Sequence, residues 1–306
     1  MRKEIIFSMK SPYREEFHIY GYVFGSGEKT VAVVGAMRGD EIQQQFVSSQ
    51  LVRILTDMER CGQITQGVEI LVIPSANHFS MNIGKRFWPM DNTDINRMFP
   101  GYDLGETTQR IASALFDKLK KYRYGIQLAS YHFTGSFIPH VRIIKTAVDI
   151  TKEAKFFGMP YIYVKSPEPF DTVMLNYNWQ IWETKAYSVY AGTTAVIDKP
   201  AAKFTWNSII RFLFQAGLLN CKTEPGFVSQ VLEDKCFRTL TADNAGFFYR
   251  QKSSGSTVRK GELLAKILNP YDGSVEGEIF SPEDATIFFA HDKDLISEKT
   301  AAFQLI

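Results

Sequence analysis

The sequence predicts an α/β fold, in which a mixed sheet is flanked by helices, followed by a small all-β domain. In the first 224 residues, strand-like runs rich in β-branched and aromatic residues alternate with amphipathic helical patterns. This alternation indicates a sheet that is covered on both faces. After about Pro225 the helical periodicity disappears and short strands alternate with turns. We therefore expect an α/β domain over residues 1–224 and a β domain over residues 225–306.

The elements of the first domain can be followed in chain order. A hairpin of Glu4–Phe7 and Phe17–Val23 precedes the sheet. In Glu41–Arg60, Glu106–Tyr122 and Ala201–Leu219, apolar residues recur at the 3.6-residue period, which predicts helices. The predicted strands between and after them are Val31–Ala36, Glu69–Pro74, Gly125–Phe133, Tyr161–Val164 and Tyr187–Tyr190.

Composition and charge exclude several classes of protein. The 306 residues include 35 basic and 33 acidic ones, a net charge of +2, and no block of Lys or Arg. This balance argues against a nucleic-acid or membrane-surface protein, and no stretch approaches the roughly 18 apolar residues of a membrane span. The three cysteines, Cys61, Cys221 and Cys236, form no C-x-x-C pair. We therefore expect a protein of the reducing cytoplasm.

The segment Gly35–Glu41 follows a predicted strand and opens a predicted helix. A zinc hydrolase built on this strand–loop–helix plan needs His at position 38, because a neutral imidazole offers a nitrogen lone pair to the metal. Position 38 is Arg, whose guanidinium is always protonated and has no acceptor. A fixed positive charge thus stands where a metal site should begin.

A second polar segment follows the next predicted strand and is rich in turns. It contains Arg86, Asn96 and Arg97. Ligands of open α/β sheets bind at the carboxyl ends of the strands, and Arg grips carboxylates with paired hydrogen bonds. We therefore predict a carboxylate-binding site. The alternative is that these side chains only pin an irregular loop through surface ion pairs.

Both segments resemble one family. Gly35–Glu41 resembles the G-x-x-H-G-x-E segment of the succinylglutamate desuccinylase/aspartoacylase family, a branch of the zinc carboxypeptidase-like hydrolases. Residues 94–97 and 99–101, D-I-N-R and F-P-G, resemble that family's D-L-N-R-x-F-P-G. The resemblance implies a carboxypeptidase-like sheet, a zinc cofactor and hydrolase activity, and the C-terminal β module looks like the family's appended domain.

The resemblance also implies roles for single residues. Glu41 matches a zinc ligand, whereas Arg38 replaces the first ligand His and joins the substrate-binding group. Asn96, Arg97 and Arg86 match the residues that hold the substrate carboxylate.

Two later positions depart from the family pattern. His132 lies near the position of the second ligand His, one or two residues out of register, and Ser130 is the alternative equivalent. A slip of one residue turns a strand side chain to the other face. Tyr190 stands at the position of the general-base Glu, and Glu183, seven residues earlier, is the candidate to replace it.

The aromatic segment Asn176–Glu183 has two interpretations. It is either an amphipathic helix packed on the sheet or a wall of the pocket. In the second case Asn176, Asn178 and Gln180 would orient a ligand by hydrogen bonds.

The C-terminal module resembles the barrel-sandwich fold of biotinyl and lipoyl carriers in the spacing of Gly255, Val258 and Gly261. The turn that would present the modified lysine, Ser281–Thr286, contains none. We therefore expect no biotin or lipoyl group, and no nucleotide. The module instead offers an interface for a homo-oligomer.

Two functions follow from these residues. The first is a hydrolase of amide or ester bonds in an N-acyl amino acid or small peptide-like carboxylate. Its metal would be bound by Glu41 and His132, with Asp40 or His78 as further ligands, and without a metal Glu41 would be an acid or base. The second is a non-catalytic or metal-independent anion-binding protein in which Arg38 replaces the zinc. A metal at Glu41 would indicate the first, and an Arg38–Glu41 ion pair the second.

Overall fold

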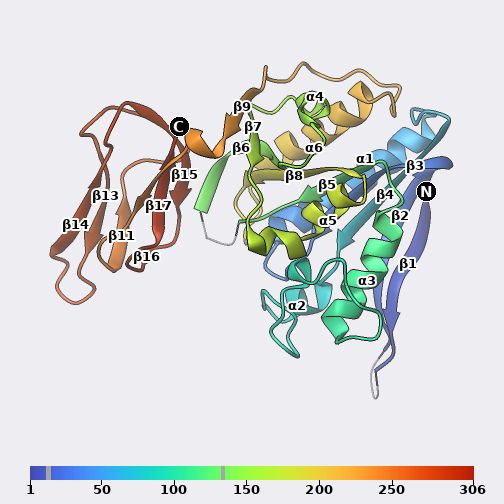
Figure 1. The fold of residues 1–306 in the computed structure, drawn as a ribbon, viewed down its shortest axis with the longest axis horizontal. Helices are drawn as coiled ribbons and strands as arrows, with labels where there is room; N and C mark the ends of the chain where they lie inside the picture. The colour runs from blue at the N-terminus through green and yellow to red at the C-terminus, as the bar shows by residue number, and fades with distance from the viewer. Residues whose placement is uncertain (12–14, 132–134) are drawn as a thin grey trace.

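A computed structural model of the chain describes residues 1–11, 15–131 and 135–306 (Figure 1). Within these residues, thirteen strands form one large sheet and four form a smaller one. The main path of the large sheet is β1 (Arg2–Met9), β2 (Phe17–Gly25), β4 (Gly67–Ser75), β3 (Gly27–Ala36), β5 (Tyr124–Leu128), β8 (Lys185–Gly192), β6 (Gly135–Ile144), β15 (Ala285–His291), β17 (Ala301–Leu305) and β10 (Arg238–Thr241).

The centre of the large sheet is parallel and its flanks are antiparallel. β4, β3, β5 and β8 run parallel to one another, whereas β2 and β6 pair antiparallel with β4 and β8. The side of β6 away from β8 pairs in parallel with β7 (Tyr161–Lys165), which in turn pairs with β9 (Gln230–Glu233). The predicted mixed sheet and the N-terminal hairpin are thus confirmed.

Helices cover both faces of the parallel centre (Figure 1). α1 (Ile42–Arg60) and α6 (Lys199–Gln215) pack on one face, against side chains such as Val33 and Ile126. α3 (Thr107–Leu119) and α5 (Leu175–Ile181) pack on the other, where a Cβ at Gly125 would lie 2.7 Å from the Trp179 ring. These helices match the predicted ones to within a few residues, and none of the described helices is long and apolar enough to cross a membrane.

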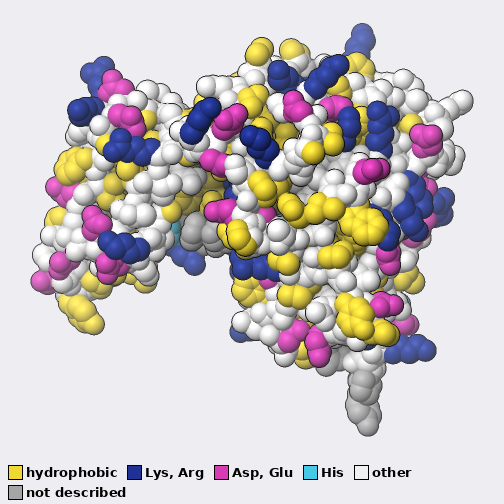
Figure 2. Space-filling model, in the orientation of Figure 1, with side chains coloured by type: hydrophobic (Ala, Val, Ile, Leu, Met, Phe, Trp, Pro, Cys, Tyr) yellow, Lys and Arg dark blue, Asp and Glu magenta, His cyan; other side chains and the backbone are white. Residues whose placement is uncertain are grey.

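The C-terminal part is built of β-strands, as predicted, and its strands pair with one another in antiparallel fashion. Its separate sheet is β14 (Val275–Phe280), β13 (Leu263–Leu268), β11 (Gly246–Arg250) and β16 (Leu295–Ile296). A further strand, β12 (Thr257–Val258), pairs with β15. Strands β9 and β15 join the large sheet, so hydrogen bonds cross the domain boundary predicted at residue 225. The division of the chain into two domains at that residue stays a prediction. Acidic and basic side chains are interspersed over the face of the molecule in Figure 2.

Candidate functional site

Three segments meet at the carboxyl ends of the parallel strands. The loop from β3 to α1 carries Arg38 and Glu41, and Ser130 follows the end of β5. The third segment is the short helix η1 (Ile95–Arg97) in the loop between β4 and α3. Parallel strands that end at one edge bring these segments together, as the sequence predicts.

Local contacts fix the loops that carry these side chains. The Asp94 carboxylate caps η1 by accepting from the backbone N–H of Asn96 at 3.0 Å. Gly39 lies so close to the next loop that a Cβ there would meet the carbonyl oxygen of Lys85 at 2.1 Å. Its N–H donates to the carbonyl oxygen of Arg86 at 2.8 Å. Only glycine permits this approach.

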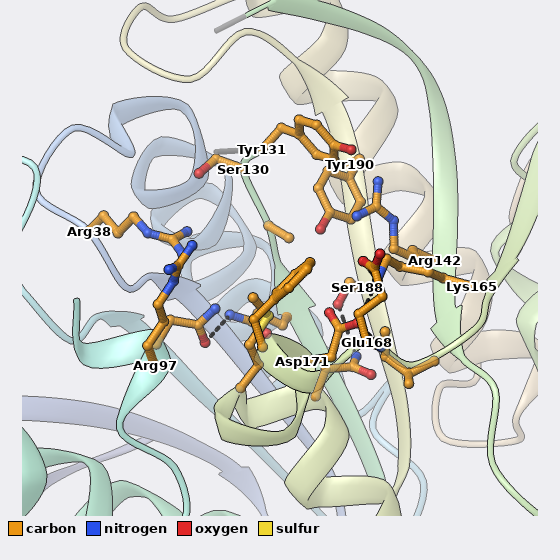
Figure 3. A pocket seen from close by; sticks show the side chains of 17 residues that line it. Arg38, Arg97, Ser130, Tyr131, Arg142, Lys165, Glu168, Asp171, Ser188 and Tyr190 are labelled. Atoms are coloured by element: carbon orange, nitrogen blue, oxygen red, sulfur yellow. Dashed lines mark hydrogen bonds and ion pairs between the residues drawn. The ribbon is translucent and has the colours of Figure 1, made fainter. Parts of the chain in front are cut away.

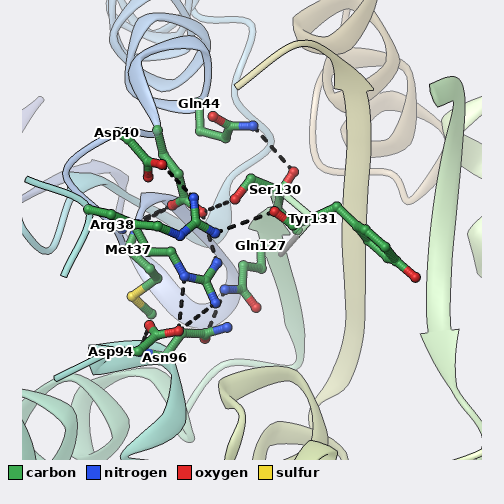
Figure 4. Close-up of polar contacts among 12 residues, drawn as sticks. Met37, Arg38, Asp40, Gln44, Asp94, Asn96, Gln127, Ser130 and Tyr131 are labelled. Atoms are coloured by element: carbon green, nitrogen blue, oxygen red, sulfur yellow. Dashed lines mark hydrogen bonds and ion pairs between the residues drawn. The ribbon is translucent and has the colours of Figure 1, made fainter. Parts of the chain in front are cut away.

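Arg38 bridges two buried carboxylates (Figure 4). Its Nη1 donates to Oε1 of Glu41 at 3.0 Å, and its Nε and Nη2 donate to Oδ2 of Asp94 at 3.0 and 2.8 Å. Arg38 is 6% exposed and Glu41 1%. Burial alone would lower the pKa of Arg38, but the charges of Glu41 and Asp94 outweigh it and raise the pKa above its ordinary value.

The remaining acceptor capacity of Glu41 is also used. Its Oε2 accepts from the backbone N–H groups of Met37 and Arg38 at 2.7 and 3.0 Å. Its Oε1 accepts from the hydroxyl of Ser130 as well as from the Arg38 guanidinium. Within the described part of the chain, Glu41 therefore has four donors. Ser130, the alternative equivalent of the second ligand His, points at Glu41.

These residues do not fit a zinc ion. Zinc needs lone pairs from several neutral or anionic ligands, whereas Arg38 has none to offer and places a cation on Glu41. No three His, Cys, Asp or Glu side chains gather to hold a metal among residues 1–11, 15–131 and 135–306. His132 lies outside the described residues.

The two further metal candidates have other contacts. Asp40 accepts from Nη1 of Arg86 at 2.5 Å, so this carboxylate is paired with a cation. The His78 ring stacks on Phe17 at 4.7 Å between ring centroids. It lines a different hollow, beside β2, and burial lowers its pKa. Among the described residues, neither side chain joins Glu41 in a group of three potential metal ligands.

Of the three residues predicted to hold a carboxylate, Asn96 and Arg97 line the pocket and Arg86 does not. Arg97 lines the pocket with a half-exposed side chain, and its Nε lies 3.7 Å from the Asp94 carboxylate that Arg38 already holds. The Oδ1 of Asn96 accepts from Gln127 at 3.0 Å, and its amide nitrogen donates to no described residue. Arg86, which is not among the residues that line the pocket, donates to Asp40 and to the carbonyl oxygen of Tyr131.

The pocket has a volume of about 280 Å³ and a polar floor. Hydrogen-bonded strands place Gln127 of β5, Ser188 of β8, Arg142 of β6 and Tyr163 of β7 in one row across the sheet. Of this row, Gln127, Ser188 and Arg142 line the pocket, on the face covered by α3 and α5. The sequence interpretation missed both Arg142 and its strand, although His140 and Arg142 alternate there with the apolar residues Val141 and Ile143.

The far wall of the pocket carries one basic and two acidic side chains. Nζ of Lys165 lies 2.8 Å from Glu168 and 2.5 Å from Asp171. Asn176 of α5 also lines the pocket and donates to the Ser188 hydroxyl at 2.9 Å. Asn178 donates to backbone carbonyl groups, including that of Met174, so it braces the helix and its loop.

The two candidates for the general base lie at opposite ends of β8. Tyr190 lines the pocket, and burial raises the pKa of its phenol although Arg142 opposes the shift. Its hydroxyl therefore stays protonated at neutral pH. Glu183 precedes β8, is exposed, and lines a surface hollow with Lys29 and Tyr122. Because the eight residues of β8 separate the two ends, the structure does not bring Glu183 to the pocket.

Residues 27–169 match the sequence model of the succinylglutamate desuccinylase/aspartoacylase catalytic domain. This segment of the chain is thus similar to the catalytic domain of that family. The resemblance seen in the two motifs is therefore confirmed, and the family name describes hydrolases that remove acyl groups from amino acids. No curated protein matches the chain.

Several solved structures share the fold over nearly the whole chain. A succinylglutamate desuccinylase from a Silicibacter species is 20% identical, with a TM-score of 0.81 over 98% of this chain and 92% of that one. The product-bound ectoine utilization protein EutE from Ruegeria pomeroyi is 21% identical, with a TM-score of 0.80 over 95% and 89%. A family protein from Shewanella amazonensis is 16% identical, with a TM-score of 0.76 over 100% and 98%.

Proposed function

We propose that this protein binds a small carboxylate-bearing molecule, of the size of an N-acyl amino acid, without a zinc ion. One observation carries the proposal: the Arg38 guanidinium forms ion pairs with Glu41 and Asp94 where the family motif begins its metal site. This is the contact that distinguishes the anion-binding function from the zinc hydrolase.

Arg97 and Asn96 are the proposed carboxylate grip. The Arg97 guanidinium lines the pocket, and its one ion pair within the described residues is a long one, with Asp94 at 3.7 Å. Its Nη groups are therefore free to donate to a carboxylate, and the amide nitrogen of Asn96 lies next to it in the chain. Arg86 has a different role in this proposal: it ties the loop at Asp40 to the segment after β5.

Zinc-dependent hydrolysis is the second candidate, favoured by the family match. It would require Glu41 to give up the Arg38 and Ser130 contacts in order to bind a metal. Without a metal, Glu41 is the candidate for acid–base chemistry because it is bonded to Arg38 and Ser130, which line the pocket, and Tyr190 is a candidate donor. The proposed function includes no step through zinc.

Isothermal titration calorimetry of N-acyl amino acids tests the proposal, carried out in a chelator and again after zinc addition. We expect binding of equal strength in both, and no release of free amino acid. Zinc-dependent turnover of the same compounds would overturn the proposal in favour of the hydrolase. Absence of binding in both conditions would also overturn it.

We also infer that the protein works in the cytoplasm. Cys61, Cys221 and Cys236 are free thiols, as is typical of proteins in a reducing compartment. A protein recovered with oxidised, cross-linked cysteines from its native cells would contradict this assignment. Self-association through the β domain stays a prediction.

A further inference from the structure

Arg142 is a buried arginine in the pocket wall. It lies on β6 between its strand neighbours Ser188 on β8 and Tyr163 on β7. Arg142 is 8% exposed and lines the pocket. Neither sequence motif contains it.

The contacts of Arg142 are with aromatic rings. Its Cζ lies 4.3, 5.0 and 5.1 Å from the ring centroids of Tyr190, Tyr131 and Tyr163. Its Nε is buried with no hydrogen-bond partner, and among the described residues no carboxylate lies within ion-pair distance of it. The nearby Asp171 is already used, because its Oδ2 accepts from Lys165 and from the backbone N–H of Glu168.

A buried cation without an anion is unfavourable, since burial removes its hydration. Tyrosine faces compensate in part through cation–π attraction, and they leave the edge of the guanidinium free to donate hydrogen bonds. Nearby, Lys165 pairs with both Glu168 and Asp171, so that group has one more negative than positive charge. Arg142 lies near this excess charge but makes no ion pair or hydrogen bond with a carboxylate among the described residues, so its guanidinium can still donate to a ligand.

We infer that Arg142 binds a second anionic group of the ligand, so that the ligand carries an oxyanion at each end. Figure 3 shows Arg97 and Arg142 on opposite sides of the pocket. A carboxylate held by Arg97 and Asn96 therefore leaves the other end of a small molecule beside Arg142 and the protonated hydroxyl of Tyr190. The second group is a carboxylate or a phosphate-like oxyanion. This inference rests on the proposed function, which supplies the first carboxylate.

Calorimetry with matched ligand pairs tests the inference on the full chain. The pairs are linear dicarboxylates of four to eight carbons and the monocarboxylates of the same length, with ω-phosphonocarboxylates as a third set. For at least one length, we expect the doubly charged ligand to bind wild-type protein at least tenfold more tightly than its monocarboxylate. A tighter phosphonate identifies the second group as phosphate-like, and a tighter dicarboxylate identifies it as a carboxylate.

The variant Arg142→Met removes the charge and keeps a long apolar side chain. We expect the tenfold preference to fall to near one in Arg142→Met, to be partly kept in Arg142→Lys, and to be unchanged in the control Arg110→Ala on the exposed surface of α3. An unchanged preference in a folded Arg142→Met would overturn the inference. If that variant does not fold, a crystal structure of wild-type protein with the preferred ligand decides: the second anionic group lies within hydrogen-bond distance of Arg142, or the inference is wrong.

The two failures can be distinguished. Monocarboxylate binding that depends on Arg97, with no preference for a second charge in wild-type protein, would overturn the role of Arg142 alone. If no carboxylate of either kind binds, the proposed function fails as well.

Discussion

Arg38 and Arg142 are two buried arginines that line the same pocket, and their partners differ. Arg38 bridges Glu41 and Asp94 through hydrogen bonds of 2.8–3.0 Å. Arg142 has three tyrosine rings and, among the described residues, no ion pair. Arg38 therefore holds the loops of the pocket together, whereas Arg142 is available to a ligand.

The Arg38 cluster does structurally what a metal does at such a site. A bound cation neutralises the first-motif carboxylate and ties the β3–α1 loop to its neighbours. Arg38 meets both demands, because its guanidinium reaches Glu41 on its own loop and Asp94 on the η1 loop. It cannot activate a water as zinc does, since it has no open coordination position.

The largest effect is expected from breaking the Arg38 cluster. Arg38→Met removes the cation that pairs directly with the buried carboxylates of Glu41 and Asp94, which should lower the free energy of unfolding by about 3–5 kcal/mol. Urea denaturation monitored by circular dichroism measures it. The matched control is Arg97→Met, whose side chain is half-exposed, and a loss of under about 1 kcal/mol is expected there. Equal losses in the two variants would contradict the structural role of Arg38.

The next effect concerns binding at the proposed grip. Arg97→Ala should weaken carboxylate binding by about 1.5–3 kcal/mol, the scale of hydrogen bonds to charged groups. Calorimetry with the best N-acyl amino acid measures this loss, with Arg110→Ala as the control. Unchanged affinity in Arg97→Ala would remove Arg97 from the site.

A pH effect is expected at His140, which is fully buried and stacks on the pocket residue Tyr190 at 4.9 Å between ring centroids. Burial, aided by the charge of Arg142, lowers the pKa of His140 to about 3. The histidine of an unfolded chain has a pKa near about 6.5. Between pH 6.5 and 3, the unfolded chain therefore binds a proton at His140 that the folded protein does not, and the free energy of unfolding falls as the pH falls below about 6.5. The slope from this group is at most about 1.4 kcal/mol per pH unit.

Urea denaturation at pH 7, 6 and 5 checks the slope. His140→Phe keeps a ring against Tyr190 and removes the titration, so its stability should depend less on pH than that of wild-type protein. The same slope in both proteins would show that His140 takes up its proton in the folded state.

The smallest effect sharpens the contrast between the two arginines. Arg142→Met loses cation–π contacts but also removes an unpaired buried charge, so the two changes oppose each other. We expect the free energy of unfolding to change by less than about 1 kcal/mol. A loss as large as that of Arg38→Met would mean that Arg142 is also part of the framework.

Most of the fold could be predicted because it depends on periodicity. Helices at the 3.6-residue period and short apolar strands were recognisable, and so was the change of pattern near Pro225. The strand predicted over Gly125–Phe133 was too long: β5 ends at Leu128, after which the chain turns to bring Ser130 to Glu41. Strand propensity continues through that turn, so propensity could not locate the end.

The site could be predicted only in part. Arg38, Asn96 and Arg97 lie in contiguous motifs, so their place at the sheet edge followed from the strand order. The place of Arg142 in the pocket wall depends on its pairing with Ser188 and Tyr163, which lie on two other strands. The sequence does not fix that register. For the same reason, the distance of Glu183 from the pocket became clear only when both ends of β8 were located.

The central claim is that Arg38 replaces the metal, and zinc content tests it most directly. Elemental mass spectrometry should be applied to the purified, untagged protein before and after dialysis against zinc, beside Arg38→His/Ser130→His, which restores an imidazole at both altered positions. The account predicts far less than one zinc per chain in both wild-type samples and a gain toward one in the double variant. Near one zinc per wild-type chain would contradict it.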